Sequence, residues 1–279
     1  MERFCVRFTD NVRIDQMVSN LRTIWLLRED TMSILQLRDQ DQSGFWFDKA
    51  LDPVAYAELH AVLKAHERHF EAGNLLKVEA DESHSIYVML KGWAASSKSL
   101  SEGQTQIIDF SLPGDFSNLL SADGKTAAIG FEVITDATTI AVVPLEEWWR
   151  LEKSLPQFSK VSQTGAAATR SRIAERVLRL GRCSAEERLA YAFLELGVRT
   201  GAMLDGNINC FHLPITQQQL GDFMGLTSVH VCRTLRRMAR HGLISTADHI
   251  DLCVLDVAAL EELAGISIDA LARKIIPPD

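Results

Sequence analysis

One short segment carries a row of cationic side chains spaced to contact phosphates. Residues 228–241 contain four arginines and no acidic residue, although the whole chain has a net charge of −8. Helical spacing places the arginines opposite an apolar stripe formed by Val231, Leu235 and Met238. A cationic helix face of this kind can lie against DNA, whereas on an ordinary helix it is simply hydrated.

The residues before this helix complete a helix-turn-helix pattern. Thr216 can cap a first helix over 217–224, and Thr227 can cap the second. Gly225 stands between them, where the first helix must end and the backbone must turn.

The residues after the second helix predict a wing. Gly242 can end that helix, and residues 243–245 and 250–255 have the pattern of two short strands joined at Asp248-His249. A cationic helix followed by a two-stranded hairpin is typical of a winged helix.

With these motifs, residues 52 to 265 resemble the Crp/Fnr family of bacterial transcription regulators. The resemblance implies that the second helix enters the major groove, with Arg233 aligned to the base-reading arginine. The run TSVHVCRTL is similar to the nitrogen-fixation and microaerobic branch. Val229 replaces the glutamate of both main branches and can touch a thymine methyl group. The implied DNA-binding residues are Thr216, Gln217, Gln218, Thr227, Ser228, Val229, His230, Arg233, Arg236 and Arg237.

Residues 70–143 have a different character. Short β-branched runs at 86–90, 106–112 and 139–143 alternate with glycine-containing turns, which predicts an antiparallel jelly roll. This stretch resembles the family's effector domain, shared with cyclic-nucleotide-binding proteins, through LKGWA, GQTQII and LPGDF. The expected fold class is α+β: a jelly-roll effector domain, a long dimerisation helix and a C-terminal winged helix-turn-helix domain.

The residues that would hold a cyclic nucleotide are largely missing. Family members that bind cAMP carry a Gly-Glu turn and an Arg-Ser or Arg-Thr pair, but no arginine follows Asp115 until Arg150. Lys125-Thr126 is the nearest substitute, and lysine lacks the bidentate fork of arginine. Ile173 and Ala174 align with hydroxyl-bearing positions that face the base. We therefore expect DNA binding without cAMP or any cofactor. The alternative is a ligand-gated sensor that requires a cyclic nucleotide, haem or another small effector.

A long helix predicted over 157–182 contains an apolar seam and the small-residue run 165–169. Such a helix can pack closely across a two-fold axis, or it can pack on its own effector domain. The resemblance favours dimerisation and hence a near-palindromic DNA site. The residues expected to mediate it are Phe158, Val161, Ile173, Val177 and Leu180.

The five cysteines are scattered with no zinc or iron–sulfur spacing, and this suits reduced thiols. Cys232 lies beside Arg233 on the second helix, where nearby cations favour the reactive thiolate, so it is either a redox-sensitive residue or simply a small one. His60, His66 and His69 are a possible metal or haem set, or solvated histidines. No cysteine or carboxylate is arranged with them, so we expect no metal site.

Length and composition complete the expectations. With 279 residues the chain is long enough for two domains, and it shows no enzyme motif, membrane span or signal peptide. We expect a cytoplasmic protein whose partners are double-stranded DNA, a second copy of itself and RNA polymerase. The N-terminal region is a partly ordered extension, a cover for a partner surface or an upstream translation product. The expected regions are this extension (1–48), a cyclic-nucleotide-binding-like domain (49–155), a dimerisation helix (156–182), a winged helix-turn-helix domain (183–265) and a C-terminal tail (266–279).

Overall fold

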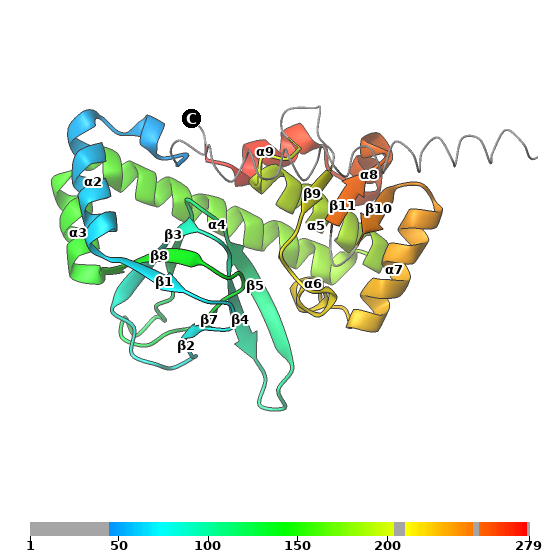
Figure 1. Ribbon diagram of the computed structural model, residues 1–279, viewed down its shortest axis with the longest axis horizontal. Helices are drawn as coiled ribbons and strands as arrows, with labels where there is room; N and C mark the ends of the chain where they lie inside the picture. Colours follow the sequence, from blue (N-terminus) through cyan, green and yellow to red (C-terminus); the bar gives the residue numbers. More distant parts are fainter. Residues whose placement is uncertain (1–44, 204–209, 248–250, 278–279) are drawn as a thin grey trace, which may run out of the picture. The chain divides into compact units, whose positions relative to one another are not determined.

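The computed structural model describes residues 45–203, 210–247 and 251–277 (Figure 1). The extension expected over residues 1–48 lies outside the described residues up to residue 44. The chain from residue 45 begins with a short 3-10 helix, η1 (Asp48–Ala50), and continues into a β domain.

The β domain consists of two four-stranded sheets, and every strand pairing in them is antiparallel. Apolar side chains from both sheets meet between them, among them Tyr87, Met89, Phe131 and Ile140. This confirms the predicted antiparallel jelly roll. The first sheet has the order β1 (Glu67–Phe70), β8 (Thr138–Pro144), β3 (Ser85–Lys91), β6 (Phe116–Asn118); the second has the order β2 (Leu75–Lys77), β7 (Gly130–Val133), β4 (Ala94–Ser99), β5 (Thr105–Ser111).

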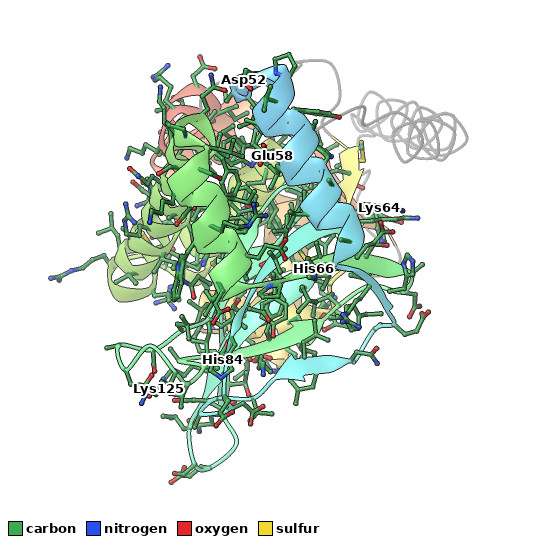
Figure 2. The ribbon with its side chains drawn as sticks, turned by 90° about the vertical axis from the view of Figure 1, so that its left-hand side faces the viewer. Asp52, Glu58, Lys64, His66, His84 and Lys125 are labelled. Atoms are coloured by element: carbon green, nitrogen blue, oxygen red, sulfur yellow. A yellow bond between two sulfur atoms is a disulfide. The ribbon has the colours of Figure 1, made fainter. Side chains whose placement is uncertain are left out.

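Helices α2 (Pro53–Ala65) and α3 (Leu145–Ser154) pack beside the sheets, and α4 (Pro156–Arg182) runs on from α3 (Figure 1). Asp52 caps α2 as the sequence predicted, because its carboxylate accepts hydrogen bonds from the amides of Val54 and Ala55. Figure 2 shows Asp52 and Lys64 at opposite ends of α2, with His66 where the chain enters β1. The core under these helices includes Phe47, Leu59, Trp148 and Phe158.

The C-terminal domain has the predicted winged helix-turn-helix fold. Its small antiparallel sheet has the order β10–β11–β9, so the wing hairpin is extended by a third strand. The elements are α5 (Ala185–Arg199), β9 (Cys210–His212), α6 (Gln217–Met224), α7 (Ser228–Arg240), β10 (Ile244–Ala247), β11 (Asp251–Val254), α8 (Val257–Ala264) and α9 (Ile268–Ile275).

Two features of this domain differ from the expectations. Residues 268–275 form α9 instead of a tail, because Leu271 and Ile275 are fully buried against the domain core. Cys210 and Cys253 are joined by a disulfide between β9 and β11, where the strand register places them directly opposite each other. The expectation of reduced thiols is therefore wrong for this pair. Cys183 and Cys232 are free, and Cys5 lies outside the described residues.

Candidate DNA-binding site

Local hydrogen bonds fix the ends of α6 and α7. Thr216 and Gln219 form a capping box: the Thr216 hydroxyl accepts from the Gln219 amide at 3.1 Å, and the Gln219 side chain accepts from the Thr216 amide at 2.8 Å. Gly225 ends α6 in the left-handed conformation, with φ of 64°. The Thr227 hydroxyl then accepts from the His230 amide at 3.2 Å and starts α7.

The angle between the two helices depends on close packing. Val231, Leu235 and Met238 are buried on the inner face of α7. On α6, a Cβ atom at Gly221 would collide with the carbonyl oxygen of Leu226, so only glycine lets the helix approach the turn this closely. The inner faces therefore hold α7 rigidly and leave its polar face outward.

Most of the sequence-predicted DNA-binding residues gather on that outer face. A shallow depression of about 350 Å³ is lined by Thr227, Val229, His230, Arg233, Thr234 and Arg237. Val229 is 59% exposed, and His230, Arg233 and Arg236 are also exposed. The amide groups in the first turn of α7 add a partial positive charge to the same surface.

The remaining predicted residues do not line the depression and lie at the starts of α6 and α7. Thr216 and Gln218 are exposed at the start of α6, and Gln217 and Ser228 are half-buried. The side chain of Gln218 donates to Asp222 at 2.7 Å, so DNA would have to compete for it.

Two residues were missed by the sequence analysis. Glu186 of α5 forms an ion pair with Arg237, so DNA would have to compete with it for that arginine. Thr234 lines the depression although it is buried, and its hydroxyl donates to the carbonyl of His230. Neither has a local sequence signal, because Glu186 lies 51 residues from its partner and Thr234 points back to its own helix.

Cys232 is a half-buried free thiol on α7. Its sequence neighbour Arg233 is exposed on the same helix. Cys232 does not line the depression.

The predicted seam of α4 divides into inward and outward residues. Phe158 and Val161 are buried within their own subunit, with the Phe158 ring 4.8 Å from that of Trp148, so they have no surface for a partner. Ile173 and Leu180 are half-buried, and Val177 is 61% exposed. A different row is exposed along the helix, with spacings of four and three residues: Gln163, Ala167, Arg170, Ala174, Val177 and Gly181.

The turn that would cradle a cyclic phosphate satisfies its own hydrogen-bonding groups. The Asp123 carboxylate accepts from the amides of Lys125 and Thr126 at 2.8 and 3.0 Å, and from the hydroxyls of Ser121 and Thr126. These hydrogen bonds lower the pKa of Asp123. Lys125 is exposed at the tip of the loop, as Figure 2 shows. The anion partner of these amides is thus a side chain of the same turn.

Between the sheets, apolar side chains fill the β domain. The rings of Tyr87 and Phe131 lie 5.1 Å apart, and burial, assisted by Asp81, raises the pKa of Tyr87 to about 12. The two α4 residues that align with base-facing positions are Ile173, which is half-buried, and Ala174, which is exposed.

The three histidines have separate partners. His60 contacts Asp48 at 2.7 Å, His66 contacts Glu147 at 2.6 Å, and His69 contacts Thr139 at 3.2 Å. Within the described residues, no three potential metal ligands come together. In the same part of the chain, no helix has the length and apolar character required to cross a bilayer.

Comparison with known proteins agrees with this architecture. Residues 187–263 match the Crp-like helix-turn-helix domain, and residues 67–154 match the cyclic nucleotide-binding domain. The nitrogen fixation regulation protein FixK of Bradyrhizobium diazoefficiens is 34% identical over 201 residues, which cover 71% of this chain and 81% of that protein. The transcriptional activatory protein AadR of Rhodopseudomonas palustris is 34% identical over 167 residues, or 60% and 68% of the two chains.

A solved structure shows the same fold. The structure of FixK2 from Bradyrhizobium japonicum superimposes with a TM-score of 0.64 at 25% identity, covering 71% of this chain and 96% of that one. The relatives are transcription factors, which confirms the prediction of a DNA-binding regulator rather than an enzyme. The chain belongs to the Crp/Fnr family of transcription regulators.

Proposed function

We propose that this regulator binds a near-palindromic DNA site as a homodimer and does so without cAMP. The observation that carries the proposal is the exposed cationic face of α7, which is held outward by a buried apolar face and by the side-chain cap at Thr227. As a transcription regulator it would contact RNA polymerase while bound to DNA in the bacterial cytoplasm.

Sequence reading would centre on the first half of α7. Arg233 is exposed and can donate two parallel hydrogen bonds to guanine O6 and N7. Val229, exposed one turn earlier, can contact a thymine methyl group but cannot accept from cytosine. Arg236 and Arg237 lie further along the exposed face and would contact phosphates, with Arg237 first leaving Glu186.

Dimerisation would use the outward row of α4. Alternating spacings of three and four residues are those of a two-stranded helical seam, and alanine and glycine allow the two helices to approach closely. Val177 and Leu178, 61% and 50% exposed, supply apolar surface near the end of this row. Of the residues first assigned to dimerisation, Val177 belongs to this row, whereas Phe158 and Val161 serve their own subunit.

Independence from cAMP is supported by the Asp123 turn. A cyclic phosphate approaching the amides of Lys125 and Thr126 would meet a carboxylate that already accepts from both. The phosphate and the Asp123 carboxylate are both negatively charged and would repel each other. The exposed Lys125 supplies only a point charge to offset this repulsion.

The test is selection of bound sequences from random duplex DNA by the purified full chain, with no ligand added. We expect a near-palindrome with guanine in each half-site, and we expect Arg233→Ala to relax the choice of that guanine. Enrichment only after addition of a cyclic nucleotide or haem would replace this proposal with a ligand-gated sensor. Enrichment of single half-sites would contradict the dimer.

A further inference from the structure

Strand β5 is an edge strand of the β domain, and the helix-turn-helix covers it. Among the described strands β5 pairs only with β4, so its other side would present unpaired backbone groups. Helix α6 of the DNA-binding domain contacts β5 directly. Trp93, Ile107 and Phe110 of the β domain belong to one continuous apolar core with Phe193 and Phe223.

The first contact is a polar one at the end of α6. The amide group of the Gln106 side chain donates to the carbonyl oxygens of Asp222 and Phe223, at 2.5 and 3.2 Å. The last carbonyls of a helix have no partner within the helix, so Gln106 acts as a cap supplied by another domain. Arg188 of α5 donates to the neighbouring carbonyl of Met224 at 3.3 Å.

The second contact is made by the ring of Phe223. It lies 4.7 Å from the ring of Phe110 on β5, and the guanidinium of Arg176 on α4 lies over it at 3.9 Å from its centre. The ring is fully buried. Phe223 therefore contacts both the edge strand and the long helix.

A bulge in β5 positions Arg176. Ser96 and Ser97 of β4 pair with Asp109 and Ile107, which leaves Ile108 as the extra residue. The freed carbonyl of Ile108 accepts a hydrogen bond from Arg176.

A buried ion network joins the same elements. Asp109 of β5 accepts from Arg172, Arg176 and Arg199 at 3.0, 3.2 and 3.3 Å. Burial alone would raise the pKa of Asp109, but the three arginines outweigh it and lower the pKa to about 2. Asp115 and Glu195 accept from the same arginines, at 2.7 Å from Arg199 and 2.6 Å from Arg176. The network thus ties the β domain, α4 and α5 together.

We propose that Gln106 and Phe110 of β5, together with Arg176 of α4, form a dock for the C-terminal end of α6. This dock holds α7, the reading helix, in the position in which it can bind DNA. We call these three residues the β5 dock. Docking leaves Val229, His230 and Arg233 exposed, so the held arrangement is the binding-competent one. This inference rests on the proposed function, and it explains how the reading geometry is set by a contact within each subunit rather than by a bound ligand.

The test compares two variants that add the same charge. Gln106→Glu places carboxylate oxygens against the carbonyls of Asp222 and Phe223, whereas Gln104→Glu adds its charge at an exposed position in the preceding turn. We measure hydrogen exchange of the α6 amides in the full chain, and affinity for the selected DNA site at fixed salt. Gln106→Glu should raise α6 exchange and weaken DNA binding, each roughly tenfold, and Gln104→Glu should change neither beyond about twofold.

Three results would overturn the inference. They are unchanged α6 exchange in Gln106→Glu, raised exchange with unchanged DNA affinity, and tighter DNA binding, which would make the docked form an inhibited one. If Gln106→Glu does not fold, Gln106→Ala removes the donors without adding charge and must show smaller changes in the same direction. If the wild type selects no DNA without a ligand, the proposed function fails, while the exchange comparison still decides whether the dock holds α6.

Discussion

The reading helix α7 and the Asp123 turn of the β domain differ in whether their anion-binding groups are accessible to a ligand. On α7 the side chains of His230, Arg233 and Arg236 point outward, and buried apolar residues hold the helix from behind. In the turn, the carboxylate of Asp123 occupies the two amides that could meet a phosphate. Under the proposed function, the chain keeps both domains of its family, and only the helix-turn-helix offers a site for a phosphate.

The largest expected effect concerns the buried ion network around Asp109. Asp109→Asn leaves three buried arginines with two carboxylates, and we expect it to lower the free energy of unfolding by about 3 to 5 kcal/mol. Urea unfolding measures this, and Asp81→Asn, in an exposed turn, is the control. A change below about 1 kcal/mol would show that the domains are held by apolar packing alone.

The same network predicts a dependence on pH. The pKa of Asp109 is lowered in the folded protein, so its carboxylate stabilises the fold at pH values above its ordinary pKa. That stability should be lost as the pH falls from about 4 toward 2. Unfolding of wild type and Asp109→Asn across this range should converge at the acid end; parallel curves would contradict the assignment.

Disruption of the proposed dimer is expected to have the next largest effect. Val177→Asp places two carboxylates opposite each other across the two-fold axis, and we expect DNA affinity to fall by roughly 100-fold or more as the dimer dissociates. Sedimentation measures the dimer. Ser101→Asp, in an exposed turn, controls for the added charge. A variant that remains dimeric would exclude this face of α4 as the interface.

The reading helix gives a smaller and more specific effect. Arg233→Ala should cost about 1 to 3 kcal/mol of binding and should remove the preference for guanine in each half-site. Arg236→Ala should instead weaken binding uniformly across sequences and reduce its salt dependence. Competition assays with single-base operator variants separate the two patterns, and loss of guanine preference in both variants would mean that Arg233 is not the base reader.

The Asp123 turn predicts no response at all. Addition of about 1 mM cyclic AMP should leave the melting temperature of the wild type unchanged, because a ligand stabilises only the state that binds it. A saturable increase in melting temperature would show that cyclic AMP binds, and would contradict the contrast drawn between α7 and the Asp123 turn.

The smallest measurable change is expected at Cys232. Peroxide treatment should weaken DNA binding of the wild type a few-fold by adding bulk and negative charge to α7, and Cys232→Ser should be less sensitive. The disulfide pair is present in both proteins, so only the difference between them reports on Cys232. Equal responses would exclude a role for this thiol.

The sequence predicted features whose cause is local. The caps at Thr216 and Thr227 and the turn at Gly225 depend on neighbouring residues, and the structure has each of them where the sequence placed it. The alternation of short strands likewise predicted the jelly roll.

Features formed by distant segments could not be predicted in this way. Apolar spacing on α4 could not distinguish residues that are buried within their own subunit, such as Phe158, from residues that face outward, such as Val177. The six charged residues of the ion network come from a strand, a turn and two helices, so no local pattern reveals them. The Cys210–Cys253 pair depends on a strand register set by the folded sheet, across a separation of 43 residues.

That disulfide makes a covalent ring out of the part of the chain that reads DNA. Both α6 and α7, with β10, lie between its two cysteines. Closing a loop of 43 residues restricts the unfolded chain by about 4 kcal/mol in the chain-entropy description. A protease that cuts one peptide bond inside the ring would open the backbone without separating the two pieces.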